Sequence, residues 1–183
     1  MSFRNTLWLF CLALLGLGQA CRPDVVKKEA ANLFFDLEAF FQSEAERLAS
    51  QQKVDKKITM NGVTEQQQES DWNAAEELKG FKDLHINRPA WRDQYLVDSL
   101  RGTNGEITGL RYVAVDSTMR IREVEVDWAD GAVSEIRVEK HMKNLIVFFH
   151  QTLLYRPGQG YSIWRAQKVP LKKKSEMVVE VEF

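Results

Sequence analysis

The sequence has few of the residues that build disulfide frameworks, metal clusters or membrane spans. It contains two cysteines and three histidines among 183 residues, and its longest apolar run is Leu7–Leu17. A transmembrane helix needs about 20 consecutive apolar residues to cross the bilayer core. This run is therefore too short to span a membrane. It also contains Cys11, so Cys21 is the only cysteine that follows it.

The first twenty residues have the layout of a secretory signal peptide. Arg4 supplies a positive charge, the apolar run follows, and the small residues Gly18 and Ala20 precede Cys21. We therefore predict that residues 1–20 are a signal peptide. The mature chain, residues 21–183, is long enough to form one domain with a substantial core. A single cysteine in such an exported chain has no disulfide partner.

The segment Leu17–Cys21 resembles the lipobox of bacterial lipoproteins. The usual pattern has a branched apolar residue three positions before the cysteine, where this chain has Gly18. Relaxed lipoboxes of this kind are similar to those of the Bacteroidota, and the resemblance implies acylation of the Cys21 thiol. Two or three acyl chains make a stable anchor where one chain would be marginal. The alternative is ordinary cleavage after Ala20, which leaves an unmodified thiol on a secreted protein.

The chain also lacks a strong net charge and the common catalytic motifs. Arg4 is the only charged residue before Cys21, so the mature chain has a formal charge of −2. Such a charge gives no field that favours nucleic acid. There is no G-x-S-x-G and no glycine-rich phosphate loop. We predict no cofactor and no catalytic residue set. Acidic residues are abundant, so a carboxylate pair for glycan hydrolysis remains an alternative.

The three histidines do not fall in a metal-binding spacing. His85, His141 and His150 are too far apart in the sequence for H-x-x-x-H, and no mature cysteine is free to assist. His141 and His150 could approach each other across a hairpin. We nevertheless predict no metal site and interpret all three as surface or half-buried histidines.

The amino-terminal third of the mature chain shows helical periodicity. Residues 24–52 carry apolar side chains at three- and four-residue steps, with Asp24 at the N-cap position, and predict one long helix. Its aromatic face, which includes Phe34 and Phe41, must be covered and is most simply packed on a sheet. A hairpin with an Asn-Gly turn and a shorter helix are expected over residues 55–84.

From residue 91 to 183 the period changes to two, which is typical of β-strands. Tight-turn signals such as Asn104-Gly105 and Asp130-Gly131 separate the alternating runs. The predicted strands are 94–100, 110–115, 121–128, 133–142, 145–155, 161–169 and 175–183. We therefore expect an α+β fold, with amino-terminal helices packed on a curved antiparallel meander that could curl into a half-barrel.

This order of elements resembles a group of small uncharacterised lipoproteins of the Bacteroidota. The motifs that carry the likeness are NGVTE, DWNAAEELKGF, LHINRPAW, ADGAVSEIRVE and the closing VVEVEF. The resemblance implies a cell-envelope location and this architecture, and no activity. Because few acids follow Cys21, we expect an anchor in the outer membrane that faces the periplasm.

Three functions are compatible with these features. The first is a non-enzymatic binding or assembly module that is tethered to the membrane through Cys21 and acts on an envelope protein or an apolar ligand. The second is a carrier for lipid or lipoprotein, with an apolar cavity beneath Phe34 and Phe41. The third is the glycan-active enzyme. Tryptophans on one concave face could stack on sugars or hold an acyl chain, although such residues more often complete a core; the candidates are Trp72, Trp91, Trp128 and Trp164.

Overall fold

The computed structural model describes residues 33–143 and 146–183, which belong to one compact unit. The helical elements are α2 (Leu37–Arg47), α3 (Ala74–Glu77), α4 (Lys79–Lys82) and the 3-10 helix η1 (Pro89–Trp91). The strands are β1 (Val54–Met60), β2 (Val63–Glu69), β3 (Tyr95–Arg101), β4 (Ile107–Ala114), β5 (Ile121–Ala129), β6 (Ala132–Lys143), β7 (Phe148–Arg156), β8 (Gly160–Lys168) and β9 (Ser175–Glu182). The fold is α+β, and strands dominate it.

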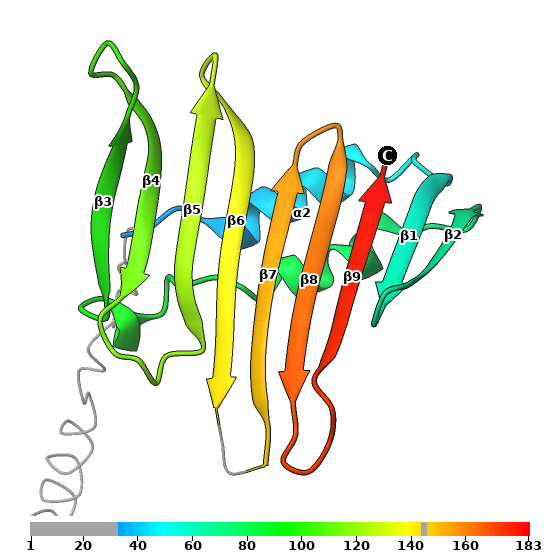
Figure 1. The fold of residues 1–183 in the computed structure, drawn as a ribbon. Coiled ribbons are helices and arrows are strands. Elements are labelled where there is room, and N and C mark those ends of the chain that lie inside the picture. The colour runs from blue at the N-terminus through cyan, green and yellow to red at the C-terminus, as the bar shows by residue number, and fades with distance from the viewer. Residues whose placement is uncertain (1–32, 144–145) are drawn as a thin grey trace, which may run out of the picture. The chain divides into compact units, whose positions relative to one another are not determined.

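The described strands form one open antiparallel sheet of nine strands (Figure 1). Their order is β2-β1-β9-β8-β7-β6-β5-β4-β3, so β3 to β9 are a meander in which each strand pairs with the next along the chain. The amino-terminal hairpin joins the sheet through β1, which pairs with β9. The last strand therefore lies inside the sheet, and β2 and β3 form its two edges.

Two hairpin turns are placed where the sequence predicted them. Asn61 and Gly62 have φ of 50° and 88° between β1 and β2, and Asp130 and Gly131 have φ of 53° and 78° between β5 and β6. Positive φ at both central residues gives a turn whose twist matches that of the flanking strands, and Asn-Gly and Asp-Gly tolerate it. These dipeptides set the register of both hairpins.

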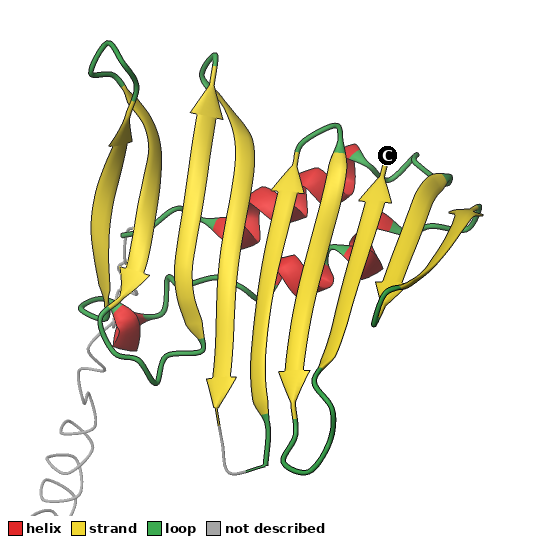
Figure 2. Ribbon diagram, in the orientation of Figure 1, coloured by secondary structure: helices red, strands yellow, loops and turns green. Residues whose placement is uncertain are grey.

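The helices α2, α3 and α4 all lie on one face of the sheet (Figure 2). Phe41 of α2 is fully buried, and its ring centroid lies 5.1 Å from that of Phe81 in α4 and 5.0 Å from that of Tyr155 in β7. Phe34 makes edge contacts with Tyr95 and Tyr112 at 5.7 and 5.5 Å. The aromatic residues of the amino-terminal segment are therefore core residues that join the helices to the sheet.

The helix predicted over residues 24–52 is shorter than expected where the structure describes it. It begins after Asp36, whose carboxylate accepts a hydrogen bond from the Ala39 backbone, and it ends at Arg47. Residues 24–32 lie outside the described residues. The backbone just before Asp36 is held by distant side chains: the Asn87 amide bonds the N–H and C=O of Phe34, and the Tyr112 hydroxyl accepts from the N–H of Phe35. These tertiary bonds override the local helical pattern.

A charged group is buried on the helix side. The Glu44 carboxylate accepts a 2.5 Å hydrogen bond from the Tyr155 hydroxyl and two more, of 2.8 and 2.7 Å, from the Arg47 guanidinium. Burial acts to raise the pKa of Glu44, but these hydrogen bonds outweigh it, and the pKa is lowered. In the same way Tyr161 donates a 2.6 Å bond to Glu77 of α3. The helices α2 and α3 are thus each linked to the sheet by a tyrosine–glutamate hydrogen bond.

Side chains alternate between the two faces of each strand. On β6 and β7, the residues that face the helices include Ile136, Val138, Leu153 and Tyr155, all buried. None of the described helices lies on the other face, which we call the open face (Figure 2). Within the described ranges, no helix is long and apolar enough to cross a membrane.

Candidate functional site

The pairing of β6 with β7 brings two histidines together on the open face. His141 lies directly opposite His150 in the antiparallel register, and the centroids of their imidazole rings are 4.2 Å apart at an interplanar angle of 75°. Directly opposed residues of an antiparallel pair have Cβ atoms about 4.5–5.5 Å apart. The approach across a hairpin that the sequence allowed is therefore confirmed.

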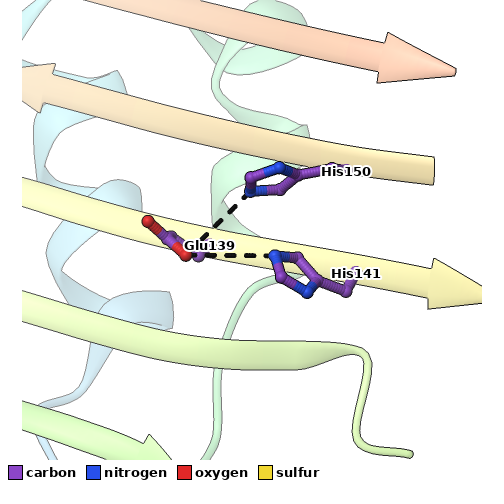
Figure 3. A group of neighbouring side chains, drawn as sticks. All are labelled: Glu139, His141 and His150. Carbon is purple, nitrogen blue, oxygen red and sulfur yellow. Dashed lines mark ion pairs between the residues drawn. The ribbon is translucent and has the colours of Figure 1, made fainter.

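A carboxylate completes the group. Glu139 lies two residues before His141 on β6, and side chains at this spacing point to the same face of a strand. Its Oε2 atom is 3.9 Å from Nε2 of His141 and 4.0 Å from Nε2 of His150 (Figure 3). One ligand atom from each of the three residues lies within 4.8 Å of the other two. We call Glu139, His141 and His150 the open-face cluster.

The two imidazole nitrogens that face Glu139 are shielded although the side chains are not. The exposed fractions of the His141 and His150 side chains are 38% and 29%. Their Nε2 atoms are nevertheless buried, and among the described residues neither atom has a hydrogen-bond partner. Most buried polar atoms in proteins are hydrogen-bonded. Two adjacent exceptions that face one carboxylate oxygen distinguish this cluster from an ordinary surface ion pair.

Side chains of the neighbouring strands β8 and β5 border the cluster. Trp164 of β8 makes an edge contact with His150, with ring centroids 5.0 Å apart. Ala166, directly opposite His150 on β8, is buried and leaves room for the imidazole. On the other side, Glu123 of β5 pairs with Glu139 across the sheet, and both of its carboxylate oxygens bond Arg111 at 2.8 Å. The charge of Glu123 is thus engaged elsewhere.

The electrostatic environment of His141 favours the neutral form of its imidazole ring. Burial lowers the pKa of His141, and the neighbouring His150 and the Arg122 charge lower it further, against the opposing effect of Glu139. A neutral imidazole retains a nitrogen lone pair. It can therefore act as a base or bind a metal ion.

The acidic residues of β5 and β6 do not form an isolated catalytic pair. Glu135 is bound by both Arg137 and Arg156, at 3.1 and 2.7 Å. Burial raises the pKa of Glu125 and of Asp127, and in each case neighbouring acids add to the effect. These side chains form a ladder of alternating charge along the open face, and they give the glycan hydrolase alternative no specific support.

The other residues that the sequence marked are dispersed. Among the tryptophans, Trp72 is buried in the core, Trp91 and Trp128 pack against the core, and Trp164 lies beside the open-face cluster. His85 lies 3.1 Å from Glu38 of α2, apart from the other two histidines. Cys21 lies outside the described residues.

Sequence reasoning noted that His141 and His150 could approach each other, but it interpreted them as ordinary surface or half-buried histidines and did not single out Glu139. The alternation of side chains along a strand could have found it, because residues 139 and 141 point to the same face. The missing information was the pairing register of the two strands of the hairpin. Comparison with known proteins adds no assignment, because no family model, curated protein or solved structure matches this chain.

Proposed function

We propose that this protein is a lipid-anchored binding module of the bacterial cell envelope, without catalytic activity, which presents the open face of its sheet to a ligand. The observation that carries the proposal is the contrast between the faces. The helix side is filled by packed aromatic rings, whereas the open face holds two adjacent buried imidazole nitrogens, of His141 and His150, that have no hydrogen-bond partner among the described residues.

The anchor is the sequence-based part of the proposal. The lipobox-like segment that ends at Cys21 supports a diacylglycerol thioether at the mature amino terminus, in the outer membrane and facing the periplasm. Such a tether would hold the domain beside the bilayer and leave the sheet free to bind.

The packing around Phe41 favours this module over the lipid or lipoprotein carrier. A carrier needs an apolar cavity beneath Phe34 and Phe41 and a sheet curled into a half-barrel. The space beneath Phe41 is filled by the rings of Phe81 and Tyr155, and the sheet is open.

Membrane fractionation tests the tether. The full-length chain, expressed in a bacterial host, should sediment with membranes, and Cys21→Ser should move it to the soluble periplasmic fraction. Cys11→Ser is the matched control, because this cysteine lies within the signal peptide and its loss should leave fractionation unchanged. Retention of the Cys21→Ser chain in membranes would contradict the proposal.

Intact-mass measurement of the mature protein provides a second, independent readout. The expected mass is that of residues 21–183 plus a diacylglycerol, with or without an amide-linked acyl chain. A mass that equals the unmodified polypeptide would overturn the anchor.

A further inference from the structure

We infer that Glu139, His141 and His150 form a binding site for one divalent transition-metal ion of the zinc class. The inference names the ligand of the open face and rests on the proposed function for its setting in the envelope. It uses only residues of this chain, each from a regular strand.

The spacing of the three ligand atoms suits such an ion after a small closure. Zinc binds imidazole nitrogen and carboxylate oxygen at about 2.0–2.2 Å, so ligand atoms at tetrahedral angles are about 3.4 Å apart. The observed separations of Glu139 Oε2 from the two Nε2 atoms, 3.9 and 4.0 Å, exceed this by about half an ångström. Side-chain rotation of Glu139 and the histidines can close this difference, because all three side chains are partly exposed.

No direct hydrogen bond explains the same arrangement. Both separations are too long for N–H···O contacts, which lie near 2.7–3.2 Å. A bound cation would satisfy both shielded Nε2 atoms and the Glu139 carboxylate together. It would also neutralise the charge of Glu139, whose neighbouring acid Glu123 is already bound by Arg111.

Protonation of both imidazole rings would balance the charge of Glu139 less well than a metal ion. The ring centroids of His141 and His150 are 4.2 Å apart, so two imidazolium charges would repel each other at close range. The charged and titratable groups that act on the His141 ring are His150 on β7, Glu139 on β6 and Arg122 on β5.

The donor set selects the class of metal. Two imidazoles and one carboxylate suit Zn²⁺, Cu²⁺, Ni²⁺ and Fe²⁺, whereas Ca²⁺ and Mg²⁺ prefer oxygen-only sets. Three protein ligands leave at least one coordination position for water or for a group of a partner molecule. Because the site lies on the open face, this position would be directed toward solvent.

Metal titration of the full-length protein tests the inference directly. The metal-free protein, in detergent micelles, is titrated with Zn²⁺ against a chromophoric chelator, and with Co²⁺ while visible absorption is recorded. We expect one ion per chain. His141→Ala and His150→Ala should each weaken binding at least tenfold, since even loss of a residue that only orients a ligand costs about that much.

Two further variants keep the test interpretable. Glu139→Gln preserves the shape of the side chain and should weaken binding without unfolding the sheet. His85→Ala removes the third histidine, remote from the cluster, and should bind as the wild type does. Circular dichroism verifies that each variant is folded.

Several outcomes would overturn the inference. These are that the wild type binds no metal ion, that the folded His141→Ala variant binds it with unchanged affinity, or that His85→Ala loses as much affinity as the cluster variants do. A stoichiometry of half an ion per chain would also overturn it, because two copies would then share the ion. None of them bears on the anchor, which the Cys21→Ser fractionation tests without metal.

Discussion

The two faces of the sheet differ in how their buried polar atoms are grouped: Trp72 Nε1, in the core on the helix side, also lacks a partner among the described residues, but only the open face places two such atoms beside one carboxylate. On the helix side, the buried Glu44 carboxylate accepts hydrogen bonds from both Tyr155 and Arg47. On the open face, the shielded nitrogens of His141 and His150 have no partner among the described residues. A protein tolerates unsatisfied buried polar atoms chiefly where they have another use. The contrast suggests that the helix side provides stability and the open face provides binding.

The largest expected effect is on the free energy of unfolding, which should respond very differently to the loss of an aromatic ring on the helix side and on the open face. Phe41→Ala removes a fully buried ring and should lower the free energy of unfolding by about 3–5 kcal/mol. Phe148→Ala, on the open face and 45% exposed, should lower it by less than about 1 kcal/mol. Urea denaturation of both variants measures the difference. Equal losses would refute the division into a stabilising and a binding face.

Metal ions should stabilise the protein only through the open face. Zn²⁺ at a free concentration one hundred times its dissociation constant should add about 2.7 kcal/mol to the free energy of unfolding. The same Zn²⁺ concentration should leave the melting temperature of His141→Ala almost unchanged, as differential scanning calorimetry can show. Equal stabilisation of this variant would place the metal elsewhere.

Removing the Tyr155 hydroxyl should test the hydrogen bond that links α2 to the sheet on the helix side. Tyr155→Phe deletes the hydrogen bond to the buried Glu44 carboxylate and should cost about 2 kcal/mol, the usual range for a bond to a charged group. The ring and its packing stay in place. A double-mutant cycle with Glu44→Gln isolates the coupling, and additive losses would contradict it.

The same carboxylate predicts a pH dependence. The folded pKa of Glu44 lies below its unfolded value near 4.5, so its contribution is present above pH 4.5 and is lost as the pH falls through the folded pKa. Acid titration of stability should show this loss in the wild type and a smaller loss in Glu44→Gln. Parallel curves for the two proteins would remove Glu44 as the cause.

The smallest effect should come from the charge ladder of the open face. Arg156 is 47% exposed in its ion pair with Glu135, and Arg137 also binds this carboxylate. Arg156→Gln should therefore change the free energy of unfolding by less than about 0.5 kcal/mol. A loss above 1 kcal/mol in urea denaturation would show that the open face also contributes to stability.

The sequence predicted those parts of the fold that local patterns encode. Alternating apolar residues located the strands β3 to β9, and Asn-Gly and Asp-Gly located turns, because both signals depend on neighbours a few residues away. The β1–β9 pairing joins segments more than a hundred residues apart and has no local signal. The start of α2 was placed too early, since Asn87 and Tyr112 hold the preceding backbone from a distance.

The candidate site was only half predictable for a similar reason. The possible approach of His141 and His150 was noted, but the strand that carries His150 was expected to begin at Leu145, whereas β7 begins at Phe148. This difference changes which residue of β7 lies opposite His141. Only the true register aligns His141 with His150 and brings Glu139 to the same point.

Anomalous diffraction from crystals grown with Zn²⁺ tests the central claim most directly. We predict a zinc peak on the open face, about 2.0–2.2 Å from Nε2 of His141, Nε2 of His150 and a carboxylate oxygen of Glu139. An empty open-face cluster, or zinc bound only at His85 or at other surface groups, would contradict the assignment of binding to this face.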